Sequence, residues 1–345
     1  MKRIAFALAT ILALTGCETL SYYVQAVGGQ LELNTRSRPV GELLADTHTP
    51  ADLRARLLVA QSVREFATRE LGLPDNKSYR SYAELDRPYV VWNVVIAPAY
   101  ALEAIESCFP VAGCVMYRGF FSREEAERYA AGALARGEDA FVYGVPAYST
   151  LGAFDDPLLS TFIRWGDTEL ARLLFHELAH QILYVPGDST FNESFAVLVE
   201  REGVRRWLAA EGRSAELSKY MDARTREREF AQRLEQTRAR LKALYASGMP
   251  KDGMRAAKKA EYEQLAADPI YKRHAGGYVG GPNNALLASF ATYSQLVPAF
   301  ERHLAAAGGD LRLFYTRMKA LSRLNKAERT RQLETQVNAM STTER

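Results

Sequence analysis

The chain has 345 residues, of which 48% are hydrophobic and 25% are charged, and its formal net charge is +3. These fractions are typical of an ordinary globular protein, and the length allows a large core. Because the net charge is small and no basic stripe is interleaved with aromatic residues, nucleic acid is not expected as a partner. The pattern leaves the oligomeric state open.

The first 16 residues have the pattern of an export signal. Two basic residues precede the apolar stretch 4–14, which is too short to span a bilayer, since a span needs about 20 residues. The next residues, Leu-Thr-Gly-Cys at 14–17, resemble the lipobox of bacterial lipoproteins. The resemblance implies that residues 1–16 are removed and that Cys17 carries the lipid anchor on the periplasmic side of the cell envelope. Glu18 after the cysteine favours the outer membrane in such lipoproteins.

A helix and three strands are expected before residue 150. The helical pattern over residues 51–71 stops at a Gly-Leu-Pro sequence, and strands are expected over 89–96, 115–121 and 140–147. Ser122 and Glu125 have the spacing of a capping box, which predicts a helix that ends near Gly137. These elements together predict a small antiparallel or mixed sheet.

Cys108 and Cys114 are the two cysteines left after Cys17. Pro110 and Gly113 lie between them, so the chain can turn tightly enough to bring the two sulfurs together. In an oxidising compartment this favours a disulfide over two free thiols. A zinc site here is disfavoured because no second ligand pair lies nearby in the sequence.

Residues 176–180 read His-Glu-Leu-Ala-His inside an apolar run, on a helix for which Asp167 is the expected N-cap. Histidines four residues apart lie one turn above each other, so His176 and His180 can bind one metal ion, which we expect to be zinc. Glu177 then lies beside the metal-bound water and can serve as general base. The alternative, a coincidental histidine pair on an ordinary helix, is disfavoured by the apolar context.

The third protein ligand is expected to be Glu193. Two histidines leave a zinc site one protein ligand short, and the next acidic residues are Asp188, Glu193 and Glu200. Glu193 opens a helix that follows a break at residues 185–187, so it can face the histidine pair from an antiparallel neighbour. Two alternatives stay open. Glu193 could complete a capping box with Thr190, and Glu200 could be the ligand or an acid that orients a histidine.

The chain after residue 200 is expected to be helical. Apolar residues recur at mostly three- and four-residue steps in a highly charged stretch that breaks at 247–250, which predicts an antiparallel hairpin at about 214–267. The expected fold is therefore α+β, with a helical C-terminal part. Residues 17–345 would form one domain or two lobes, at about 17–165 and 166–345.

The motif helix, together with Asn192–Ala196 and Glu200, resembles the gluzincin aminopeptidases. In that group a His-Glu-Leu-Ala-His-Gln helix is followed by Asn-Glu-Gly-Phe-Ala and by a further glutamate. The interval before Glu193 is shorter here, and Ser194 replaces the glycine. More of the chain is similar to a group of zinc aminopeptidase-like lipoproteins of Gram-negative bacteria. The matching segments are 87–93, 108–114, 147–152, 154–157 and 282–285.

The resemblance implies a zinc peptidase that removes N-terminal residues from peptides. The substrate would lie along the edge strand at Tyr143–Ser149. An oxyanion donor could be Tyr148, Tyr278 or Tyr293, and the free amine could be bound by Asn283 or Asn284. The competing expectations are an endopeptidase of the envelope and a non-catalytic lipoprotein scaffold that retains the zinc fold.

Overall fold

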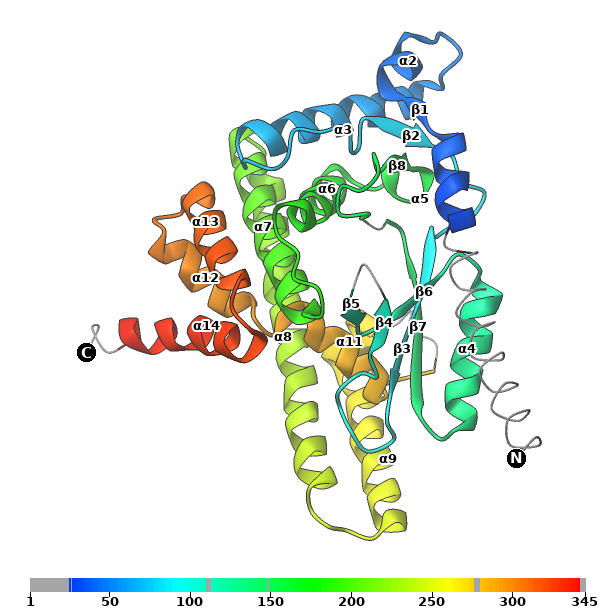
Figure 1. The fold of residues 1–345 in the computed structure, drawn as a ribbon, viewed down its shortest axis with the longest axis vertical. Helices are drawn as coiled ribbons and strands as arrows, with labels where there is room; N and C mark the ends of the chain where they lie inside the picture. The colour runs from blue at the N-terminus through cyan, green and yellow to red at the C-terminus, as the bar shows by residue number, and fades with distance from the viewer. Residues whose placement is uncertain (1–24, 26, 110–112, 148, 276–279, 342–345) are drawn as a thin grey trace, which may run out of the picture.

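The computed structural model describes residues 25, 27–109, 113–147, 149–275 and 280–341. Its fold is α+β, which confirms the predicted class, because small sheets precede the motif helix and helices form the chain after it (Figure 1). In the described part of the chain, no helix has both the length and the apolar character needed to cross a membrane.

Three short strands that are far apart in the sequence form the first sheet. β1 (Arg38–Pro39) pairs antiparallel with β2 (Ser81–Ala83), and β2 pairs parallel with β8 (Leu158–Leu159). The short helix α2 (Val40–Ala45) follows β1, and α5 (Ser160–Ile163) follows β8.

The predicted helix at 51–71 is α3 (Ala51–Arg69). Its buried residues recur every three or four positions, so one face of the helix lies in the largest core cluster: Leu53, Leu57, Ala60, Val63, Phe66 and Ala67.

The central sheet has the strand order β6-β3-β7, and both pairs are antiparallel. β3 (Val91–Ala97) and β7 (Asp139–Val145) match two of the predicted strands. Alternate residues of β3 face opposite sides. Val94 and Ile96 pack against α4 (Arg123–Ala135), whereas Val95 and Ala97 belong to the core cluster formed with the helices after residue 214.

The predicted strand at 115–121 is confirmed only over β6, because Val115 belongs to a different strand. β4 (Ser107–Phe109) and β5 (Gly113–Val115) form a two-stranded hairpin of their own, and β6 (Arg118–Phe120) joins β3. The chain leaves one sheet at Met116 and enters another at Arg118. Ser122 caps α4 by accepting a hydrogen bond from the backbone N–H of Glu125, as the capping box predicts.

Two long antiparallel helices form the predicted charged hairpin. They are α8 (Ser214–Tyr245) and α9 (Lys251–Ala267), and they extend away from the rest of the fold (Figure 1). The remaining helices are α10 (Pro269–Ala275), α11 (Asn284–Ser294), α12 (Val297–Ala306), α13 (Leu311–Ser322) and α14 (Lys326–Ser341). α11 packs against β3, β7, α7 and α8, so it connects the sheet with the helical part.

Candidate metal centre

The two motif histidines lie on α6 (Asp167–Ile182), a helix that is buried over most of its length. The prediction that Asp167 caps this helix is wrong. Gly166 occupies the N-cap position, and Asp167 is the first helical residue. Its carboxylate is instead drawn into ion pairs with Arg56 and Arg213, which are distant in sequence.

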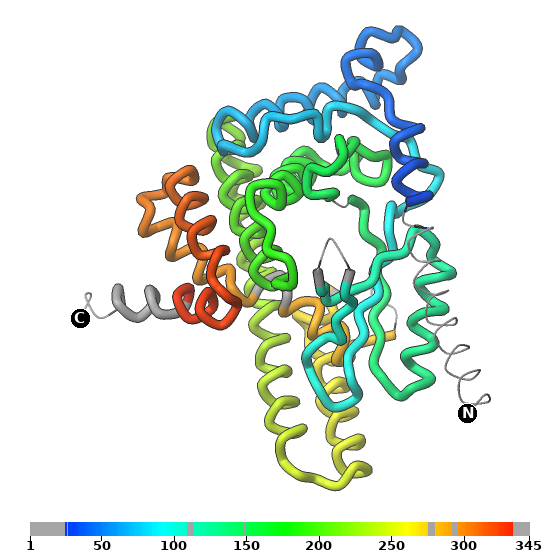
Figure 2. Tube along the Cα trace, in the orientation of Figure 1, coloured from blue at the N-terminus to red at the C-terminus, as the bar shows by residue number. Residues whose placement is uncertain are grey.

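A short turn reverses the chain between α6 and α7 (Ser189–Ala210), and Asn192 closes that turn. The Asn192 side chain accepts a hydrogen bond from the backbone N–H of Val185 at 2.8 Å and donates one to the Val185 carbonyl at 2.9 Å. α7 then packs along α6, as the tube in Figure 2 shows. The turn therefore places the residue after Asn192, Glu193, opposite the histidine pair.

Asp188 is the N-cap of α7, so the capping box proposed for Thr190 and Glu193 is not formed. The Asp188 carboxylate accepts a hydrogen bond from the backbone N–H of Phe191 at 3.3 Å. The same carboxylate pairs with Arg329 of α14, whose Nη2 lies 2.6 Å from Asp188 Oδ2. Because Asp188 satisfies the helix start, the Glu193 side chain is available to the histidines.

His176, His180 and Glu193 bring three potential ligand atoms together, all within 4.8 Å of one another. The Nε2 atoms of the two histidines are 3.2 Å apart, and Glu193 Oε2 lies 3.3 Å from His176 Nε2 and 3.7 Å from His180 Nε2. Tetrahedral zinc with bonds of about 2.0–2.1 Å requires ligand atoms about 3.3 Å apart. The three residues therefore fit a tetrahedral metal ion with one position left open.

Glu200 lies behind the histidine pair rather than among the ligand atoms. Its Oε2 is 2.9 Å from Nδ1 of His176, on the opposite side of the ring from Glu193. Arg172 Nη1 lies 3.4 Å from both Glu200 oxygens. Of the two roles that the sequence left open, this position fits the orienting one. A carboxylate that accepts from Nδ1 fixes the ring with Nε2 towards the metal position.

The electrostatic field at this site favours a cation. Burial lowers the pKa of His176, but its hydrogen bonds to Glu193 and Glu200 outweigh burial and raise the pKa to about 10. Burial raises the pKa of Glu193, but His180 and His176 bring it down to about 2. The pKa of Glu200 is likewise about 2, because Arg172 and His176 outweigh its burial. A field that retains a proton on His176 also attracts a metal cation.

Glu177, the proposed base, is 8% exposed and lies on the same helix turn as His176. Burial raises the pKa of its carboxyl group, although the two histidines act in the opposite direction. Asp156 lies close enough for the two carboxyl groups to affect each other. Asp156 is also buried, and burial raises its pKa to about 6 even though Thr150 donates hydrogen bonds to it.

Tyr117, in the turn between β5 and β6, lies close enough to Glu193 and Glu177 for their charges to act on its hydroxyl, and the sequence did not single it out. Burial raises the pKa of its hydroxyl well above the usual value, and the charges of Glu193 and Glu177 raise it further. The hydroxyl therefore stays protonated close to both carboxylates. The one feature of the sequence that could have pointed to Tyr117 is its position, three residues after Cys114.

The candidate oxyanion donors named from the sequence cannot be placed. Tyr148 and Tyr278 lie outside the described residues, and so does the side chain of Tyr293 in α11. Among the described residues β7 lies at the edge of its sheet, and its last three residues, 143–145, belong to the segment expected to bind the substrate.

Asn283 and Asn284 have structural roles instead of the proposed amine-binding role. Asn283 caps α11 and donates a hydrogen bond to the Ala140 carbonyl at 2.9 Å. Asn284 is fully buried. Its amide donates to the carbonyls of Pro98 and Ala99, and its side-chain oxygen accepts from Tyr245 and Tyr262. Neither amide is free to bind a substrate amine.

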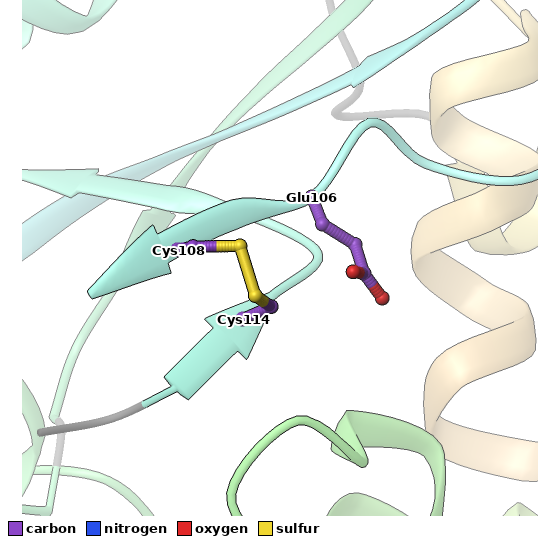
Figure 3. A group of neighbouring side chains, drawn as sticks. All are labelled: Glu106, Cys108 and Cys114. Atoms are coloured by element: carbon purple, nitrogen blue, oxygen red, sulfur yellow. A yellow bond between two sulfur atoms is a disulfide. The ribbon is translucent and has the colours of Figure 1, made fainter. Parts of the chain in front are cut away.

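Cys108 and Cys114 form a disulfide across the β4–β5 hairpin, with Glu106 beside it (Figure 3). These three residues are close enough to form a metal-binding group. Sulfurs joined to each other offer no thiolate to a metal, so this group is not a second metal site. Cys17 lies outside the described residues.

Fold and site together define an α+β protein with a buried group of two histidines and a glutamate that could hold a metal. A family model described as "Putative aminopeptidase" matches residues 21–333, and the chain belongs to this family. The membership indicates a peptidase that acts on peptides. Searches of curated proteins and of solved structures give no match.

Proposed function

We propose that the protein is a zinc-dependent peptidase that removes N-terminal residues from peptides. The observation that carries the proposal is the convergence of His176, His180 and Glu193 at the edge lengths of a tetrahedral zinc site. Membership of the aminopeptidase family supports the choice of reaction and substrate.

In this proposal the two Nε2 atoms and the Glu193 carboxylate hold the ion, and Glu200 orients His176 through Nδ1. Bound zinc supplies Lewis acidity, which polarises a peptide carbonyl and makes water nucleophilic near neutral pH. Arg172 balances the charge of Glu200, so Glu200 stays ionised despite its burial.

Glu177 moves the proton in the proposed reaction. Its carboxylate accepts a proton from the attacking water and delivers that proton to the nitrogen of the leaving amine. Burial raises the pKa of Glu177, which brings its proton affinity closer to neutral pH. Tyr117, whose hydroxyl stays protonated, would donate a hydrogen bond to the carbonyl oxygen as negative charge develops there.

The substrate main chain would pair with the edge of β7 that is not paired with β3. In the described part of the chain, β7 pairs with β3 on one side only, so its other edge offers backbone groups to an extended peptide.

We further propose that residues 1–16 are a lipoprotein signal and that Cys17 anchors the enzyme to the cell envelope, at the outer membrane. The export pattern of the first 17 residues supports the anchor, and Glu18 after the cysteine supports the outer membrane.

The test uses the chain from residue 18 onward, loaded with zinc. Metal content is measured by elemental analysis, and cleavage by reporters that carry a free N-terminal residue. Glu177→Gln should retain one zinc and lose cleavage by at least about a hundredfold. Tyr117→Phe should lower kcat on the order of a hundredfold with little change in KM. Full activity of Glu177→Gln would rule out the catalytic proposal.

Two further comparisons define the ligands and the type of peptidase. Glu193→Gln should lose zinc, whereas Glu200→Gln should keep it with weaker binding, and the reverse result would exchange their roles. Peptides with a blocked N-terminus should not be cleaved. Equal cleavage of blocked and free peptides would identify an endopeptidase instead.

A further inference from the structure

A cavity of about 410 Å³ lies between α7, α8, α11 and the loop that follows β3. Its volume is within the range of about 300–1,000 Å³ that is common for ligand sites, and far exceeds the roughly 30 Å³ that one water occupies in the liquid. No ligand of the proposed metal site and no proposed catalytic residue lines this cavity.

Two residues that line the cavity are close in sequence to residues at the candidate metal centre. Thr190 lines it, and Thr190 precedes Glu193 by one turn of α7, so the two side chains lie on the same face of that helix. Met116 also lines it and is next in sequence to Tyr117, the tyrosine whose pKa is raised by the charges of Glu193 and Glu177.

A hydrogen bond holds the wall of the cavity close to the metal ligand. The Leu296 backbone N–H donates to Ser194 Oγ at 3.3 Å, and Ser194 directly follows Glu193. This contact ties the end of α11, which contributes Ala288 and Ala291 to the cavity, to the helix that carries Glu193.

The lining combines apolar side chains with charged side chains whose charges cancel, which suits a large uncharged group. Leu102, Ala288 and Met116 provide apolar surface, and the alanines leave the space open. Four charged residues line the cavity, Glu103, Glu235, Arg238 and Lys242, and their charges sum to zero. Arg238 is already engaged, since it donates to the Leu102 carbonyl at 3.0 Å and lies 3.4 Å from Glu235.

We propose that this cavity is the specificity subsite that takes a large apolar side chain of the peptide, adjacent to the bond that is cleaved. The inference rests on the proposed peptidase function and adds the substrate class: peptides with a residue such as Leu or Phe beside the scissile bond. The small side chains of α8 and α11 set the size of the side chain that fits.

The test fills the cavity from its exposed side. Ala239 of α8 lines the cavity and is exposed, so Ala239→Trp can occupy the space without disturbing the core. Ala215, also exposed on α8 but outside the cavity, gives the matched control Ala215→Trp. In the full, zinc-loaded chain, Ala239→Trp should lower kcat/KM for Phe-containing peptides at least about tenfold and leave Ala-containing peptides nearly unchanged. Ala215→Trp should match the wild type on both.

The outcomes separate this inference from the proposed function. If Ala239→Trp cleaves both peptide series as the wild type does, the cavity is not the subsite. If the wild type cleaves no peptide, the peptidase proposal fails, and calorimetric titration with phenylalanine amide decides the cavity alone. Binding by the wild type that is lost in Ala239→Trp supports the inference, whereas equal binding or no binding overturns it.

Discussion

Removing Arg329 should destabilise the protein strongly, because it would leave a buried carboxylate without its counter-charge. Arg329 is 3% exposed and Asp188 is 4% exposed. Arg329 Nε and Nη2 both donate to Asp188 Oδ2, at 3.0 and 2.6 Å, and Nη1 donates to the Leu324 carbonyl at 2.6 Å. In Arg329→Met, Asp188 would keep the hydrogen bond from Phe191 but lose its cation. Breaking a buried pair in this way costs about 3–5 kcal/mol.

Urea unfolding followed by circular dichroism measures this loss directly. Arg331→Met is the matched control, because Arg331 lies on the same helix with a side chain that is 71% exposed, and it should cost no more than about 0.5 kcal/mol. The double variant Asp188→Asn with Arg329→Met should be more stable than Arg329→Met, since the unpaired charge is gone. A loss below about 1 kcal/mol in Arg329→Met would refute the reasoning.

Three further predictions concern the surroundings of the metal centre. Glu200→Gln should weaken zinc binding about 10–100-fold in competition with a chelator, and unchanged affinity would argue against an orienting role. Burial raises the pKa of Asp156 from 3.8 to about 6, so its contribution to the free energy of unfolding falls as the pH rises through that window. Urea unfolding should therefore show Asp156→Asn gaining stability relative to wild type between about pH 4 and pH 6, and a relative loss would contradict this. Replacing Cys108 and Cys114 together with serine should lower the free energy of unfolding by about 2 kcal/mol, from the short loop that the disulfide closes, and an unchanged unfolding midpoint would count against it.

The sequence predicts the parts of the site that local geometry determines. His176 and His180 share one face of a helix because of their spacing alone, so their proximity needs no knowledge of the fold. The sequence also predicts Glu193 as a ligand, because the break before α7 requires the chain to turn back. The α+β class follows from the order of the predicted strands and helices.

Contacts between distant segments explain what the sequence did not predict. Tyr117 reaches the site through the fold of two sheets, and no local pattern marks it. Asp167 has the residue type of a good N-cap, but Arg56 and Arg213 attract its carboxylate from elsewhere in the chain. The segment 115–121 is apolar enough for one strand, yet pairing partners on two sheets divide it.

Asn284 has a consequence for the order in which the chain folds. Its side chain joins the carbonyls of Pro98 and Ala99 to the hydroxyls of Tyr245 and Tyr262, on the two arms of the hairpin. Asn284 lies 22 residues from Tyr262 and 186 residues from Pro98 in the sequence, so its amide joins segments that are far apart along the chain. Such contacts between distant parts of a chain form slowly. Docking of the hairpin onto the sheet is therefore expected to be a late event, and pulsed hydrogen exchange during refolding would time it.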